Sequence, residues 1–130
     1  MSKIGDFLTE AGVFYMATED GAQPKVRPLG AFLEADGKII FGVGDFKEVY
    51  RQMKANPLVE IVACRKDMHW LRYTGRAVFE TDEKYAKMMI ETSGLQQIYN
   101  EGTGHKLMAF HLEDATAVDI PVMGPGESLL

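Results

Sequence analysis

Two basic residues near a glycine-rich strand end predict an anion-binding site. Gly42-Val43-Gly44 closes a run of strand-forming residues, and Lys47 and Arg51 follow in a segment with helical spacing. Glycine lets a ligand approach the backbone, and a helix N-terminus attracts phosphate through its free N–H groups and its dipole. Arg27 lies on the preceding strand, and a hairpin between the two strands lets it reach the same anion. Together these residues predict a phosphate site of mononucleotide size.

The same residues also have a simpler interpretation, in which the basic side chains are solvated surface charges and Gly42 and Gly44 are strand irregularities. Asp45 puts a negative charge beside the predicted phosphate, and Phe46 offers no hydroxyl to it. Asp45 suits the helix N-cap, with Glu48 completing a capping box. Spacing alone leaves both interpretations open.

A second candidate is the aromatic segment that begins at His69 and ends at Gly75. Alternation along a strand puts Trp70 and Arg72 on one face and Tyr73 on the other. Planar ligands such as flavins need flat apolar walls and a few hydrogen-bond donors, and Trp70 is able to supply such a wall. The alternative is that Trp70 packs in a barrel or an interface.

Nucleophilic and metal chemistry find little support in the sequence. Cys64, the single cysteine, lies in an apolar run, which predicts a buried structural thiol. The three histidines lack metal-ligand spacing, so we expect no metal site. The phosphate-loop, dinucleotide-binding, serine-hydrolase and zinc-protease motifs are absent. We therefore name no catalytic residue.

Hydrophobic periodicity predicts the elements that position these residues. We expect helices over 3–11, 45–55 and 82–92, a weaker helical turn over 95–99, and strands over 13–18, 24–33, 38–44, 58–64, 69–81, 107–112 and 115–120. Pro28 indicates an edge strand or a bulge, and Gly75 a bend or bulge. Because tight turns join most strands, we predict a mainly β fold with α (α+β), an antiparallel sheet closed into a barrel with peripheral helices.

Composition limits the class of protein. The 130 residues, 46% hydrophobic and 25% charged, predict a single globular domain over 1–121 and a C-terminal tail over 122–130. The net charge of −5 argues against nucleic acid and anionic membranes as partners. No apolar stretch approaches the ~18 residues of a membrane span, the start of the chain does not resemble a signal peptide, and one cysteine forms no intrachain disulfide. We expect a cytoplasmic protein.

Three segments in order resemble a known family. PKVRPLG (24–30), KIIFGVGDFKEVYRQMKANPLVEI (38–61) and HWLRYTGRAVFETD (69–82) are similar to the small FMN-binding split-barrel proteins of the pyridoxamine 5′-phosphate oxidase-like superfamily. The resemblance covers roughly residues 5–120. Size and layout are closer to its nitroimidazole-reductase-like and general flavin-binding branch than to true pyridoxamine-phosphate oxidases. It implies an antiparallel split β-barrel with peripheral helices.

The resemblance also implies a cofactor, a partner and a set of site residues. Members are homodimers that hold two FMN molecules between the subunits. Arg27 and Lys47 then contact the FMN phosphate, and the partner chain contributes Trp70 and the segment 105–110. The residues implied along the isoalloxazine ring and ribityl chain are Pro28, Leu29, Phe41, Gly42, Val43 and Gly44.

Three functions follow as hypotheses. The first is an FMN-dependent oxidoreductase that acts on a small organic substrate, with NADH or NADPH as candidate donor. The alternative is a non-catalytic flavin or haem binding module that serves as carrier, store or redox sensor. The third is a ligand-free barrel that contacts nucleic acid or protein, which the net charge of −5 opposes. The sequence leaves the choice between FMN and a deazaflavin open.

Overall fold

The computed structural model describes residues 2–130, which form three helices and eight strands. The helices are α1 (Lys3–Ala11), α2 (Glu48–Ala55) and α3 (Lys84–Ser93). The strands are β1 (Phe14–Asp20), β2 (Gln23–Leu29), β3 (Leu33–Ala35), β4 (Lys38–Gly44), β5 (Leu58–Cys64), β6 (Trp70–Phe79), β7 (Leu107–Ile120) and β8 (Glu127–Ser128).

The strands form one antiparallel sheet in the order β2-β1-β5-β6-β7-β4-β3, with β8 added to β7. The two ends of this path, β2 and β3, do not pair. The sheet is therefore not closed, as expected for the split barrel that the resemblance implied, whereas the closed barrel predicted from the turns was wrong. Pro28 lies on the edge strand β2, where its missing N–H costs no ladder bond. A register shift between Thr74 and Arg76 confirms the irregularity expected at Gly75.

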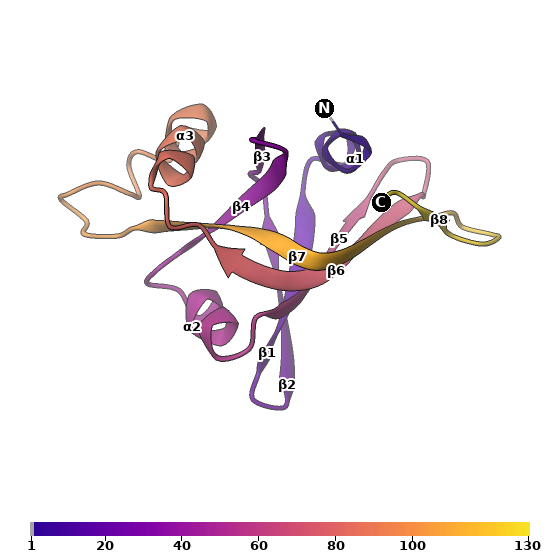
Figure 1. Ribbon diagram of the computed structural model, residues 1–130, viewed down its shortest axis with the longest axis horizontal. Helices are drawn as coiled ribbons and strands as arrows, with labels where there is room; N and C mark the ends of the chain where they lie inside the picture. The colour runs from indigo at the N-terminus through magenta and orange to yellow at the C-terminus, as the bar shows by residue number, and fades with distance from the viewer. Residues whose placement is uncertain (1) are drawn as a thin grey trace.

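Two apolar clusters hold the sheet and helices together. The main one, under α1 and α2, is built around Phe41, whose ring centroid lies 5.7 Å from that of Phe14 and 5.6 Å from that of Phe110. The second joins α3 to the other face of β4 and β7 through residues such as Met89 and Leu107. α2 and α3 therefore lie on opposite sides of β7 (Figure 1).

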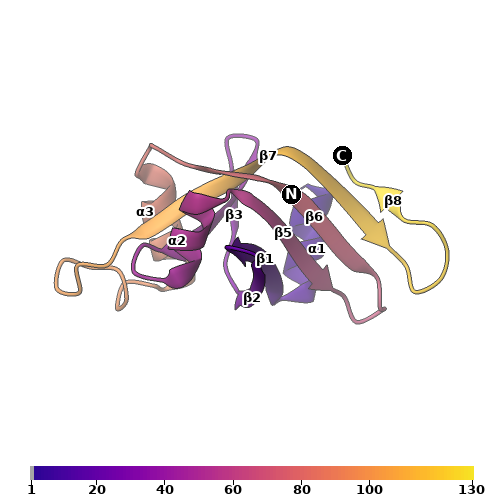
Figure 2. The same cartoon turned by 90° about the horizontal axis from the view of Figure 1, so that it is seen from below.

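The N-terminal helix is attached through its first turn. Ser2 is the N-cap, and its hydroxyl accepts a hydrogen bond of 3.0 Å from the amide of Gly5. Ser2 also donates from its amide (3.1 Å) and its hydroxyl to the carboxylate of Glu34 in β3. Figure 2 shows α1 toward the β8 end of the molecule, with α2 and α3 toward the other end.

The structure corrects the predicted start of α2. The helix begins at Glu48 rather than Asp45, and its N-cap, Lys47, makes no side-chain capping bond. Asp45 instead bonds to Lys106, the residue before β7: its amide donates to the Lys106 carbonyl (2.9 Å), and its carboxylate accepts from the Lys106 amide (3.0 Å). The Asp45 carboxylate, which we expected to cap the helix, is therefore used in a hydrogen bond to a residue far along the chain.

Further expectations differ from the structure. The strand predicted over 24–33 is divided into β2 and β3, and β2, which carries Arg27, pairs with β1 and not with β4, so the predicted hairpin was wrong. The strands predicted over 107–112 and 115–120 are one strand, β7, which passes through Asp114 at a φ of +51°. The tail predicted over 122–130 contains β8, which pairs with β7. Cys64 is exposed, so the prediction of a buried thiol was wrong. Its side chain lies on the outer face of β5, whereas Val59, Ile61 and Ala63 point into the core.

Candidate functional site

Arg27 points from the edge strand β2 toward the barrel interior. It pairs with Met16 of β1, and its Nη1 donates to the Met16 carbonyl (3.0 Å) and to the hydroxyl of Thr18 (2.8 Å). Its Nη2 donates to Oε1 of Gln52 on α2 (2.8 Å). Burial lowers the pKa of this guanidinium from its usual value, but an arginine remains charged at neutral pH.

Every oxygen that Arg27 contacts is uncharged. Within residues 2–130 no carboxylate lies within ion-pair distance of it, and its Nε makes no hydrogen bond. A half-buried cation with free N–H donors and no counter-ion suits an anionic ligand such as phosphate, which takes the remaining donors of the planar fork.

Thr18 and Gln52 hold this guanidinium, and the sequence analysis missed both. Each side chain is only 3% exposed, and the Thr18 hydroxyl donates to Gln52 Oε1 at 2.6 Å. The available signal was a polar residue within the apolar face of a predicted helix: Gln52 lies between Val49 and Met53, which are buried. Such a residue needs a buried polar partner.

Lys47 lies where β4 turns into α2 and has no carboxylate within ion-pair distance in the described chain. Its Nζ lies 5.8 Å from the ring centroid of Phe46. Phe46 in turn stacks on His105, with centroids 3.8 Å apart and an interplanar angle of 22°. The bonds between Asp45 and Lys106 fix this arrangement, so His105 and Lys106 lie close to the start of α2.

Arg51, the third basic residue of the predicted site, is neutralised. Its guanidinium contacts the carboxylates of Glu48 (2.5 Å) and Asp20 (3.3 Å), and both raise its pKa. The side chain is 57% exposed. Of the three basic residues of the predicted site, Arg27 and Lys47 therefore remain without a carboxylate partner in the described chain: Arg27 bonds to Gln52 of α2, and Lys47 is the N-cap of that helix.

The glycines at the end of β4 are used for packing. A Cβ on Gly42 would lie 2.9 Å from side-chain atoms of Met89 and Leu107, and one on Gly44 would lie 2.7 Å from the Phe46 ring. Side chains from α3, from β7 and from Phe46 and Tyr99 thus occupy the space that we expected a ligand to approach. The neighbouring Phe41 and Val43 are buried in the main cluster.

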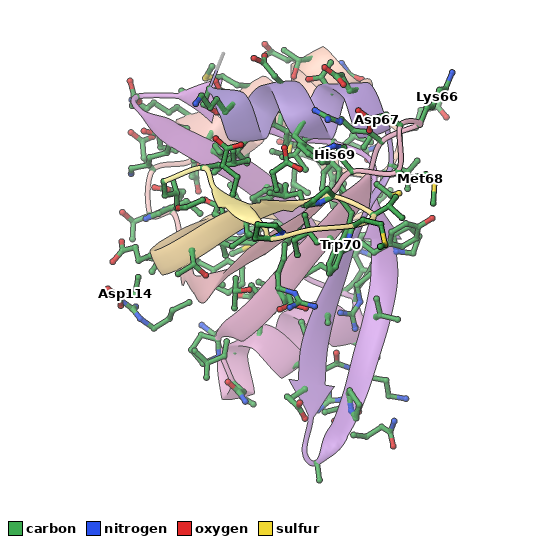
Figure 3. All side chains as sticks on the ribbon, turned by 90° about the vertical axis from the view of Figure 1, so that its right-hand side faces the viewer. Lys66, Asp67, Met68, His69, Trp70 and Asp114 are labelled. Carbon is green, nitrogen blue, oxygen red and sulfur yellow. The ribbon has the colours of Figure 1, made fainter. Side chains whose placement is uncertain are left out.

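The remaining predicted residues lie at the sheet edge and on its outer face. Pro28 is exposed and Leu29 half-buried at the end of β2. Trp70 starts β6, half-buried, with the Arg72 guanidinium 4.8 Å from its ring centroid. Figure 3 shows Trp70 beside the turn formed by residues 65–69, far from Asp114. Since Arg27 faces inward and Trp70 outward, one chain does not bring these two together.

Two cavities open elsewhere on the structure. One, of about 530 Å³, lies between the start of α1, the β3–β4 hairpin, β6, β7 and the C-terminal residues; we call it the α1 cavity. The other, of about 680 Å³, lies between α3, the loop before β7 and β7 itself. Neither is lined by Arg27, Lys47 or Trp70. The predicted site therefore lies outside both of these cavities.

Two other features are absent from residues 2–130. No group of three or more His, Cys, Asp or Glu side chains is arranged to hold a metal ion there. None of the helices has the length and apolar character needed to cross a bilayer.

Comparisons with known proteins agree with the fold. The sequence model of the family described as Pyridoxamine 5′-phosphate oxidase matches residues 1–120. A NimC/NimA family protein from Clostridium acetobutylicum is 30% identical, with a TM-score of 0.88 over 98% of this chain and 89% of that one. No curated protein sequence matches the chain.

More distant structures share the fold alone. A heme binding protein from Mycobacterium smegmatis is 14% identical, with a TM-score of 0.71 over 94% of this chain and 54% of that one. A FAD-binding protein from Mesorhizobium loti is 16% identical, with a TM-score of 0.59 over 92% and 96%. Because the family match spans nearly the whole domain, the chain belongs to the pyridoxamine 5′-phosphate oxidase family.

Proposed function

We propose that this protein binds FMN and acts as a cytoplasmic oxidoreductase on a small organic substrate. The observation that carries the proposal is two cations without carboxylate partners in the described chain: Arg27, which bonds to Gln52 of α2, and Lys47, the N-cap of the same helix. Flavin binding is typical of the family, and the FAD-binding relative from Mesorhizobium loti has the same fold. The phosphate group distinguishes FMN from riboflavin, and this site offers positive charge for it.

The proposal assigns a role to each part of the surface. Arg27 and Lys47 hold the phosphate, and Thr18 and Gln52 orient the Arg27 fork. The exposed edge of β2 at Pro28 and Leu29 lies along the ring, and β4 from Phe41 through Val43 to the two glycines forms the wall behind it. Bound FMN supplies hydride or electron transfer, with NADH or NADPH as the proposed donor.

We further propose that the site is completed by a second copy of the chain. The outer face of β1, β2 and β5 exposes apolar side chains that a monomer would normally cover: Tyr15 is 49% exposed, Leu58 61% and Val26 68%. A two-fold contact through this face would hide them and would bring Trp70 of each chain toward its partner. Substituting Val26→Arg should then reduce the mass measured by light scattering from two chains to one.

A non-catalytic flavin or haem binding module is the alternative. The contacts of Arg27 favour it: Met16, Thr18 and Gln52 supply no group that titrates near neutrality. A general acid or base is therefore missing beside this cation. The heme binding relative from Mycobacterium smegmatis shows that this fold also accommodates a protein of that description.

Absorbance spectra test the cofactor, and turnover tests the class. The purified protein is incubated with excess FMN or haem, desalted and scanned. The proposal predicts a flavin spectrum with one FMN per chain, reduction by NADH or NADPH, and repeated turnover with a quinone acceptor. A haem spectrum without a flavin spectrum contradicts it. Flavin that is reduced once without turnover on any acceptor supports the module instead.

A further inference from the structure

The α1 cavity contains a tyrosine hydroxyl without a partner. Tyr73 of β6 is 6% exposed and lines the cavity. Its hydroxyl bonds to none of the residues 2–130, yet no fully enclosed side-chain oxygen or nitrogen in that range lacks a partner. The hydroxyl must therefore open onto the cavity. Burial raises the pKa of Tyr73, so the group remains a hydrogen-bond donor at neutral pH.

The ring that carries this hydroxyl is held in place. Tyr73 belongs to the main apolar cluster, and its ring centroid lies 6.3 Å from that of Phe41. Across the sheet it pairs with Ile61 of β5 and Ala117 of β7, which are 0% and 1% exposed. The donor therefore points in one direction and does not need to be ordered when a ligand arrives.

Most other polar groups of the wall are already engaged. Glu34 accepts hydrogen bonds from the start of α1. The Nδ1 of His111 lies 2.5 Å from Glu80, and its Nε2 lies 2.8 Å from Glu113. Lys38 contacts Glu80 at 3.3 Å. Tyr73 is thus the buried polar side chain of this wall that is left for a ligand.

The charges around the cavity balance. Two acidic residues, Glu34 and Asp36, and two basic residues, Lys3 and Lys38, line it. The apolar part of the wall comes from both ends of the chain and from the sheet: Ile4, Ile39, Leu112 and Leu129. A ligand with a net charge gains nothing from this balance, whereas a neutral molecule with both apolar and polar surface fits it.

We propose that the α1 cavity binds a neutral compound of one or two rings, whose carbonyl oxygen accepts a hydrogen bond from Tyr73. The volume of about 530 Å³ lies within the range of small-molecule sites. Neither Arg27 nor Lys47 lines this cavity, so the site is separate from the proposed flavin site and does not depend on it.

Binding of coumarin, a neutral two-ring carbonyl compound, tests the proposal. Coumarin is titrated into the full chain, with and without FMN, and followed by calorimetry and by methyl NMR. We expect saturable binding, with the largest shifts at Ile39, Leu112 and Leu129. Tyr73→Phe keeps the shape and removes one hydrogen bond, so affinity should fall about 2- to 10-fold. The charged analogue 2-naphthoate should bind more weakly than coumarin.

Two variants locate the site. Leu129→Trp fills the cavity from a half-buried position and should abolish coumarin binding, while Tyr15→Phe removes a hydroxyl from the exposed outer face and should leave it unchanged. Lys47→Gln should weaken FMN but not coumarin, which separates this proposal from the flavin proposal. The proposal fails if coumarin does not saturate, if Tyr73→Phe binds it as tightly as wild type, or if the shifts fall on Ile90 and Leu107 beside α3.

Discussion

Replacing Arg27 by glutamine should weaken FMN binding far more than it disturbs the fold. A hydrogen bond to a charged group contributes about 1.5–3 kcal/mol, which at 1.36 kcal/mol per factor of ten corresponds to about 10- to 150-fold in affinity. Glutamine reaches less far and carries no charge, so we expect a loss within this range. Quenching of FMN fluorescence during titration with the protein measures it.

The same substitution also has a cost for the fold. Arg27 donates to the oxygens of Met16, Thr18 and Gln52, and unmade bonds of this kind cost about 1–3 kcal/mol in the free energy of unfolding. Removing a partly buried charge offsets part of that loss. Urea denaturation and circular dichroism establish that the variant is folded under the conditions of the FMN titration.

Arg51→Gln is the matched control for the loss of a positive charge. Arg51 is exposed and already paired with Asp20 and Glu48, so its removal should change FMN affinity less than 2-fold. Arg27→Lys keeps the charge but loses the planar fork and should fall between wild type and Arg27→Gln. The reasoning is refuted if Arg27→Gln, shown to be folded, binds FMN within 2-fold of wild type, or if Arg51→Gln weakens it equally.

Three further outcomes are expected. Hydrogen bonds from Tyr85 and Lys84 lower the pKa of Asp36 below its usual 3.8. The ionised carboxylate therefore stabilises the fold above about pH 4, and this stabilisation is lost as the pH falls through the lowered pKa. Asp36→Asn should show a smaller drop in unfolding midpoint than wild type between pH 5 and 3. Gly42→Ala should lower the free energy of unfolding by about 1–3 kcal/mol, because the new Cβ meets Met89 and Leu107. A Cβ on Gly30 has no neighbouring atom within 4 Å, so Gly30→Ala should match wild type in thermal unfolding.

The sequence predicted much of the fold because the local signals agree with the long-range ones. Turn residues bracket β4 and β5, and their predicted bounds match the structure. Pro28 indicated an edge strand since a proline cannot donate to a ladder. Asp45 failed as a cap because a partner 61 residues away, the Lys106 amide, takes its carboxylate. Pairings of that length leave no local pattern.

Much of the candidate site depends on such pairings. Arg27 and Lys47 were found from their types and positions, but the residues that orient Arg27 come from β1 and α2 and meet only in the folded chain. Cys64 was misplaced because an apolar run does not reveal that one of its faces is exposed. The groups that surround the Tyr73 hydroxyl come from distant parts of the chain, so the sequence does not show that it is left without a partner.

The dissociation constants of FMN and riboflavin, measured side by side on the wild-type protein, test the central claim most directly. The two ligands share the ring and the ribityl chain and differ in the phosphate that Arg27 and Lys47 are proposed to hold. We predict that FMN binds at least about 10-fold more tightly than riboflavin and that added salt reduces the difference. Equal affinities for the two ligands, or no binding of FMN, would contradict the account.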